Sequence, residues 1–116
     1  MNGKDKFLKT IQIVVIIALI EIVSQIVLKK GSIFSHFNYV IYGMIGYCII
    51  GYLLSTNFSF DGIGQVNLIW NCMSTILAFT FGYLIFKEPI NRYTYYSIVF
   101  ALAAIYFSYL SDIKDI

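Results

Sequence analysis

The residue with the clearest chemical potential in this sequence is Glu21, a carboxylate inside a long apolar stretch. The stretch runs from Ile11 to Leu28 and is followed at once by Lys29 and Lys30. A charged residue near the middle of a membrane span costs at least about 2.5 kcal/mol on insertion scales, so such residues usually mark a substrate or proton pathway. Glu21 is therefore the first candidate for a functional residue.

A carboxylate in an apolar environment can serve two ligands. Removal of water disfavours the charged form and promotes proton uptake, whereas the ionised form attracts a cation. Because one carboxylate cannot hold both at once, Glu21 predicts a site where a proton and a cationic substrate compete. The alternative is an ion pair or hydrogen bond that only fixes helix packing, but no span offers a lysine or arginine to pair with Glu21.

Other polar residues could complete this site. Ser24 and Gln25 follow Glu21 by three and four residues, a spacing that places all three on one helical face. The third apolar stretch adds a polar stripe at helical spacing: Asn67, Asn71, Ser74 and Thr75, with Trp70 beside it. In lipid such a stripe should face protein or a water-filled cavity. We expect it to line a cavity or, alternatively, to hydrogen-bond a neighbouring helix.

Composition places these residues in a membrane protein. Of 116 residues, 59% are hydrophobic and 12% charged, and a soluble domain of this size would expose too much apolar surface. About 20 apolar residues cross a bilayer as a helix, and short connections favour antiparallel neighbours. We expect an all-α integral membrane protein, a single domain over 1–116, with four transmembrane helices in an up-down bundle: 7–28, 39–58, 64–86 and 93–110.

The connections and glycines refine this expectation. We expect a loop over 29–38, and Pro89 should end the third span because proline cannot continue the helical ladder. Gly43, the pair Gly46-Tyr47 and Gly51 recur near three- and four-residue spacing in the second span. They predict a face of small residues that lets another helix approach closely.

Charge and motif content exclude several function classes. The net charge is only +2, without a run of like charges, so nucleic-acid binding has no support. We find no nucleophile–base pair, metal cluster or phosphate-binding loop, and we expect no enzyme activity and no cofactor, with the proton as coupling ion.

The positive charges divide evenly between the two expected membrane sides. Four lie on one side and four on the other: Lys4, Lys6, Lys9 and Lys114 against Lys29, Lys30, Lys87 and Arg92. Orientation follows the excess of positive charge in loops. A chain without such an excess can insert both ways, which permits an antiparallel homodimer.

The chain resembles the small multidrug resistance family, within the drug/metabolite transporter group. The resemblance rests on a set of residues spread over the whole chain: Glu21 with Lys29 eight residues later, Tyr47-Cys48, Leu53-Leu54, Gly64, Trp70 and Phe86-x-Glu88. It implies an antiparallel homodimer, or a paralogous heterodimer, in the cell membrane of a bacterium, with both Glu21 copies in one chamber. It further implies exchange of protons for a small cationic or polar substrate, with Trp70 stacked on that substrate and Tyr47 lining the chamber.

Several positions depart from the family's pattern. Asn67 stands where the family has a chamber tyrosine, Cys72 and Ser74 replace a glycine pair, Gly62 replaces a proline, and Gln25 is bulkier than the usual residue. Amide side chains suit sugar hydroxyls or guanidinium-like groups better than flat aromatic drugs. The candidate substrate- and proton-binding residues are Glu21, Gln25, Tyr47, Asn67, Asn71 and Trp70.

Two other hypotheses stay open. The run Val23-Ser24-Gln25 and the Glu88-Pro89 ending are similar to four-helix subunits that flip lipid-linked aminoarabinose, although that branch generally lacks the first-helix glutamate. Such a flippase, for a lipid-linked sugar or polyprenyl phosphate, would bind an anionic membrane lipid. The third hypothesis is a non-transporting subunit that requires a paralogous partner.

Overall fold

The computed structural model describes residues 2–114, which form four α-helices. They are α1 (Gly3–Phe34), α2 (Phe37–Asn57), α3 (Ile63–Phe86) and α4 (Arg92–Ile113). All four are long and apolar enough to cross a membrane, and the described chain contains no strand. The expected all-α architecture with four spans is confirmed, and the chain is a multi-pass membrane protein by helix length and hydropathy.

Local sequence signals account for most helix ends. Asn2 and Asn91 precede α1 and α4, and their side chains accept hydrogen bonds from backbone N–H groups of the first turn, as asparagine does at N-caps. The third helix ends at Phe86, and Lys87 then adopts a left-handed conformation with φ 56°. The predicted end of this span before Pro89 is confirmed.

The first helix is longer than the sequence suggested. It continues through Lys29 and Lys30 to Phe34, and the chain turns at Ser35, which has φ 57°. The loop expected over 29–38 is therefore wrong for most of its length. Lysine is a good helix former, and its long side chain can carry the charge to the polar level while the backbone stays helical.

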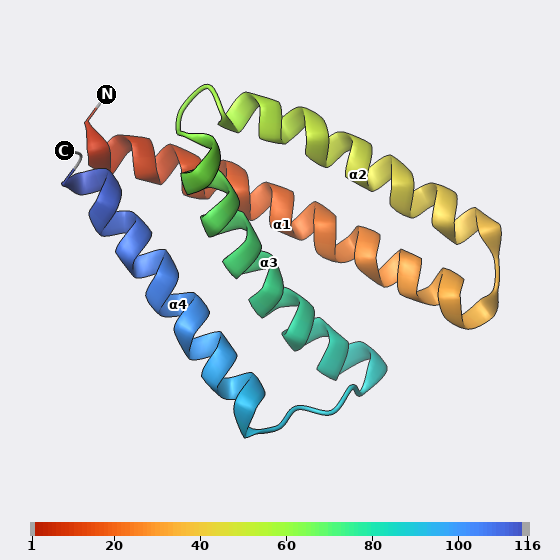
Figure 1. The fold of residues 1–116 in the computed structure, drawn as a ribbon. Coiled ribbons are helices and arrows are strands. Elements are labelled where there is room, and N and C mark those ends of the chain that lie inside the picture. Colours follow the sequence, from red (N-terminus) through yellow and green to blue (C-terminus); the bar gives the residue numbers. More distant parts are fainter. Residues whose placement is uncertain (1, 115–116) are drawn as a thin grey trace.

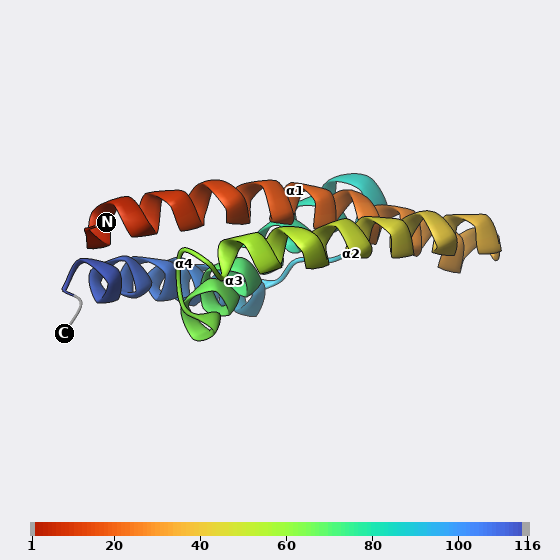
Figure 2. The same ribbon diagram turned by 90° about the horizontal axis from the view of Figure 1, so that it is seen from above.

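The helices alternate in direction and form a thin assembly. α1 and α2 lie antiparallel and side by side, and α3 and α4 form a second antiparallel pair set at an angle to the first (Figures 1 and 2). α1 packs against each of the other three helices and is the most buried of them. The Cα atoms span 50 × 35 × 16 Å, so one chain is about two helices thick.

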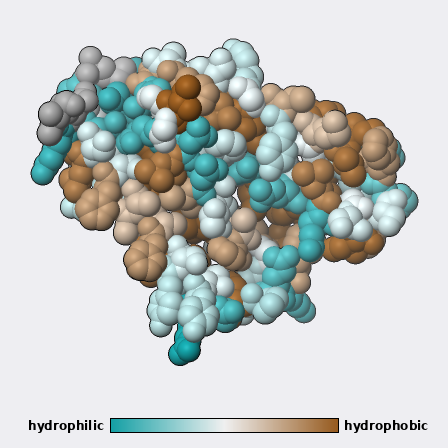
Figure 3. All heavy atoms as spheres, viewed as in Figure 1, coloured by the Kyte–Doolittle hydropathy of each residue, from teal (hydrophilic) through white to brown (hydrophobic). Residues whose placement is uncertain are grey.

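Both ends of the described chain lie at one end of the molecule, together with the α2–α3 connection (Figure 1). Hydrophilic residues gather near that end, whereas hydrophobic residues cover much of the part formed by the far ends of α1 and α2 (Figure 3). The surface is thus polar where the chain enters and leaves and apolar along much of the α1–α2 pair.

The contact between α1 and α2 depends on two glycines. A Cβ added at Gly46 would overlap the Ser24 side chain, and one added at Gly43 would overlap Leu28. The predicted close approach is confirmed at these positions. It is wrong at Gly51, where a Cβ would have no neighbour within 4 Å. Gly51 is exposed, because five residues after Gly46 the helix has turned it to another face.

Candidate functional site

Glu21 lies where α1 is packed against its neighbours, and its carboxylate is nearly inaccessible. The residue is 6% exposed. One carboxylate oxygen, Oε2, accepts a hydrogen bond of 3.3 Å from the Tyr47 hydroxyl of α2. The other, Oε1, is buried and has no hydrogen-bond partner within the described chain.

A second bond extends this contact into a chain of three side chains. Gln25 Nε2 donates to the Tyr47 oxygen at 3.2 Å, and the same hydroxyl donates onward to Glu21. Tyr47 is 37% exposed, so the chain runs from the buried carboxylate towards a more open region. The predicted face shared by Glu21 and Gln25 is confirmed by their common partner.

The close approach of α1 and α2 sets the position of Tyr47. Gly46, the preceding residue, lies directly against Ser24 of α1. The Ser24 hydroxyl is turned back onto its own helix and donates to the Ile20 carbonyl at 2.9 Å. Ser24 therefore contributes to the packing of α1 against α2. The hydroxyl that donates to Glu21 is that of Tyr47 on α2.

A cleft between α1 and α3 begins beside Gln25. It has a volume of about 180 Å³, and its lining residues come from both helices and the start of the α3–α4 connection: Ile22, Gln25, Ile26, Lys29, Ala78, Phe81, Gly82, Phe86 and Glu88. An adjoining hollow shares Gln25, Ala78 and Glu88 and adds Ser74 and Thr75 of the predicted polar stripe. Pockets for drug-sized ligands have about 300–1,000 Å³, so this cleft fits a smaller molecule.

An ion pair closes one side of the cleft. Lys29 Nζ lies 3.4 Å from Glu88 Oε2, and both side chains are about half exposed. Such a solvent-accessible pair contributes little to stability, typically about 0–1 kcal/mol. From the sequence, Glu88 was noted only as part of the end of the third span, in the Phe86-x-Glu88 pattern. A place for Glu88 in a cleft was not predicted.

The remaining candidates of α3 are less closely connected. Trp70 is partly buried, and its indole Nε1 has no partner in the described part of the chain. Asn67 is partly buried and Asn71 is exposed. The hydrogen bonds that reach Glu21 and Tyr47 come from α1 and α2 alone. A binding role for Asn67, Asn71 and Trp70 stays a prediction.

Comparison with family models, with curated proteins and with solved structures gives no significant match to this chain. What can be concluded about function thus depends on the chemistry of the site. At this site the described residues provide the buried Glu21 carboxylate with an unpartnered oxygen, its hydrogen-bonded Tyr47 and Gln25, and a small cleft that Gln25 lines but Glu21 and Tyr47 do not.

Proposed function

We propose that the protein is a secondary transporter that exchanges protons for a small cationic or polar substrate at Glu21. The observation that supports this most strongly is the state of the Glu21 carboxylate. It is buried in a membrane helix, and among the described residues its Oε1 has no hydrogen-bond partner and no lysine or arginine forms an ion pair with it. A charge left in this state is costly, so a proton or a substrate cation is needed to neutralise it.

The hydrogen-bonded chain connects the carboxylate to the cleft. The Tyr47 hydroxyl donates to Glu21 and itself accepts from the Gln25 amide. Gln25, at the other end of the chain, also lines the cleft. A substrate in the cleft would contact the amide of Gln25 first, and this amide is linked through Tyr47 to Glu21.

The size and polarity of the cleft favour small polar cations. A volume of about 180 Å³ is below the usual range for drug-sized ligands. Its polar groups are an amide, a carboxylate and an ammonium, with phenylalanines along α3. Guanidinium or small ammonium compounds match this chemistry, in line with the resemblance to small multidrug resistance transporters and with its departures from them.

Transport in reconstituted vesicles tests the proposal. A pH gradient should drive exchange of a guanidinium, quaternary ammonium or polyamine probe by the wild type, and Glu21→Gln should abolish it. Glutamine has the same shape and cannot release a proton, so the helices should still assemble with an unchanged helical circular-dichroism spectrum. Retained pH-driven exchange in Glu21→Gln would contradict the proposal.

A lipid flippase is the second candidate, and one observation favours it. An apolar groove of about 490 Å³ runs along the outer side of α1 and α2, lined by Leu19, Ile20, Val23, Ser24, Val27, Tyr42, Ile45, Gly46 and Ile49. A prenyl or acyl chain matches this lining. The flippase hypothesis predicts that Lys29, Lys30 or Arg92 binds the anionic headgroup. Of these three, Lys29 is paired with Glu88, which reduces the positive charge it can offer. Mass spectrometry showing a co-purified polyprenyl phosphate, with binding unchanged in Glu21→Gln, would favour this candidate.

A further inference from the structure

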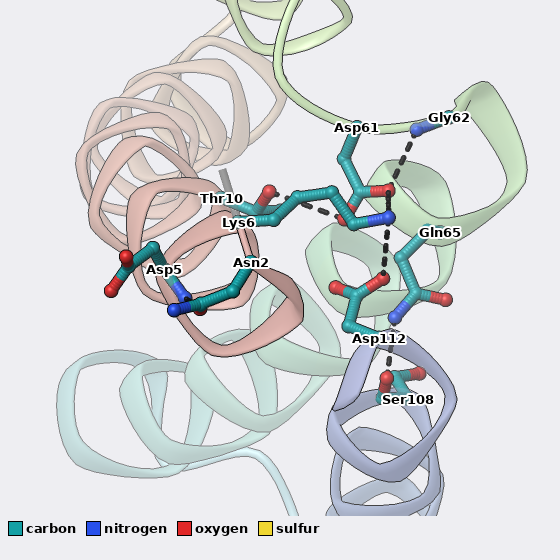
Figure 4. A network of polar contacts seen from close by, with 9 residues as sticks. All are labelled: Asn2, Asp5, Lys6, Thr10, Asp61, Gly62, Gln65, Ser108 and Asp112. Carbon is teal, nitrogen blue, oxygen red and sulfur yellow. Dashed lines mark hydrogen bonds and ion pairs between the residues drawn. The ribbon is translucent and has the colours of Figure 1, made fainter. Parts of the chain in front are cut away.

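A second group of ionisable residues lies at the end of the molecule where the N-terminal part of α1, the α2–α3 connection and the end of α4 meet (Figure 4). Lys6 Nζ lies 3.6 Å from Asp112 Oδ1 and 3.9 Å from Asp61 Oδ1. The Asp61 and Asp112 side chains are only 5% and 6% exposed. Two nearly buried carboxylates thus face the same ammonium group.

The two carboxylates differ in their hydrogen-bond donors. Asp61 accepts from the Gly62 backbone N–H at 2.8 Å and from the Thr10 hydroxyl at 3.3 Å, in addition to Lys6. Asp112 has only Lys6 as an ion-pair partner among the described residues, and its Oδ2 is buried without a hydrogen-bond partner. Asp61 is therefore equipped to hold a negative charge, and Asp112 is not.

The nearest neutral donor does not satisfy Asp112 Oδ2. Gln65, at the start of α3, lies beside Asp112, but its amide donates to the Ser108 carbonyl at 2.6 Å. The Ser108 hydroxyl, one turn earlier on α4, is buried and has no hydrogen-bond partner among the described residues. The backbone of α1 approaches α4 so closely here that a Cβ at Gly3 would overlap the Asp112 carbonyl.

Other charged groups nearby lie outside this contact. Asp5 points away from the cluster (Figure 4) and is exposed. Lys9 lies over the Phe60 ring, 5.2 Å from its centroid. Lys114 is exposed beyond the end of α4. Among the described residues, the charged groups that converge here are thus Lys6, Asp61 and Asp112.

We propose that Asp112 binds a proton, shared with Asp61, and that this proton-binding site holds the ends of α1, α4 and the α2–α3 connection together. Like charges that share a buried site cannot both ionise without a large cost, so one carboxyl keeps its proton. The site is separate from Glu21, which lies 11 residues beyond Thr10 on α1, about 16 Å along the helix axis. Loss of the proton leaves an unpaired charge on Asp112 and favours opening of this end.

Stability as a function of pH tests the proposal. Above about pH 5 the aspartates of the unfolded chain carry almost no proton, whereas the native state still holds one at this pH and releases it as the pH rises further. A native state that binds more protons loses stability as the pH rises. The apparent melting temperature of the wild type in detergent should therefore fall between about pH 4 and about pH 7 and change little above that.

Asp112→Asn resembles the protonated form and should flatten this profile. Its melting temperature should exceed that of the wild type at about pH 9 by roughly 5 °C. Asp5→Asn, an exposed aspartate on α1, is the matched control and should keep the wild-type profile. If the wild-type profile is flat, or Asp112→Asn keeps the wild-type slope, the proposal is wrong.

An infrared measurement on the assembled protein does not depend on the stability of a variant. A protonated carboxyl band should be present at about pH 5, persist in Glu21→Gln and shift in wild-type protein labelled with ¹³C-aspartate. Absence of a label-sensitive band at about pH 5 would overturn the proposal. Because only aspartate carries the label, the shifted band reports on aspartate and not on Glu21. The test therefore holds whether or not Glu21 exchanges protons for a substrate.

Discussion

Among the acidic residues of the described chain, Glu21 is the buried one that has no positively charged partner. Asp61 and Asp112 share Lys6, Glu88 is paired with Lys29, and Asp5 is exposed. The Glu21 carboxylate is buried without a positive charge to balance it, and its Oε1 has no hydrogen-bond partner in the described chain. This combination is more typical of a ligand site than of a structural contact, because a permanent buried charge without a partner would lower stability.

Tyr47→Phe should weaken binding of a cationic substrate about tenfold at neutral pH. The variant removes the only hydrogen bond that Glu21 receives in the described structure, and a hydrogen bond to a charged group contributes about 1.5–3 kcal/mol. Ligand titration by calorimetry measures the change. Tyr52→Phe on the same helix is the control, because the Tyr52 ring is 73% exposed; equal affinities for the two variants would argue against a role for Tyr47.

For single residues, the sequence predicted which side chains share a face of one helix better than it predicted contacts between helices. The spacing of Glu21 and Gln25 requires a shared face, and both join the same hydrogen-bonded chain. Tyr47 entered only through a family resemblance, because spacing within α2 does not tell which side of it faces α1. The cluster of Lys6, Asp61 and Asp112 was missed, since three charges far apart in sequence resemble ordinary loop and terminal residues.

The helices themselves follow from apolar length and caps, but their contacts depend on small residues. Gly43 and Gly46 allow α1 and α2 to approach until side chains of α1 occupy the space above them. Gly51 belongs to the same sequence pattern and has open space instead. The glycine spacing correctly predicted close packing against α1 at Gly43 and Gly46. It could not show that Gly51 lies outside this contact.

Gly46→Ala should destabilise the protein by about 1–3 kcal/mol, the usual cost of overpacking. The new methyl group would overlap the Ser24 side chain and push α2, with Tyr47, away from Glu21. Thermal unfolding in detergent measures the effect. Gly51→Ala is the matched control and should be neutral or stabilising, because alanine favours helix over glycine by about 1 kcal/mol; a similar loss in both variants would contradict the proposed contact.

The whole molecule is thin, and its lysines and arginines divide evenly between its two ends. One end holds Lys4, Lys6, Lys9 and Lys114, and the ends of the helix pairs opposite it hold Lys29, Lys30, Lys87 and Arg92. A layer 16 Å thick leaves large apolar faces for lipid or for a second copy of the chain. Association of two copies in opposite orientations, as the resemblance implies, is compatible with both features.

Ser32→Lys should bias insertion towards one orientation. Ser32 is exposed on the last turns of α1, near Lys29 and Lys30, and an added positive charge favours the cytoplasmic location of that end. Paired reporters fused to the C-terminus should show both orientations for the wild type and one for Ser32→Lys. Ser32→Gln should behave as the wild type, and a wild type found in a single orientation would exclude dual insertion.

Proton release from detergent-solubilised protein is the most direct test of whether Glu21 holds either a proton or a substrate cation. Guanidinium compounds, quaternary ammoniums, polyamines and an aminosugar lipid would be added to weakly buffered protein. We expect at least one cation to release protons from the wild type and from Glu88→Gln, but none from Glu21→Gln. Cation-driven release that persists in Glu21→Gln, or that disappears only in Glu88→Gln, would contradict the account.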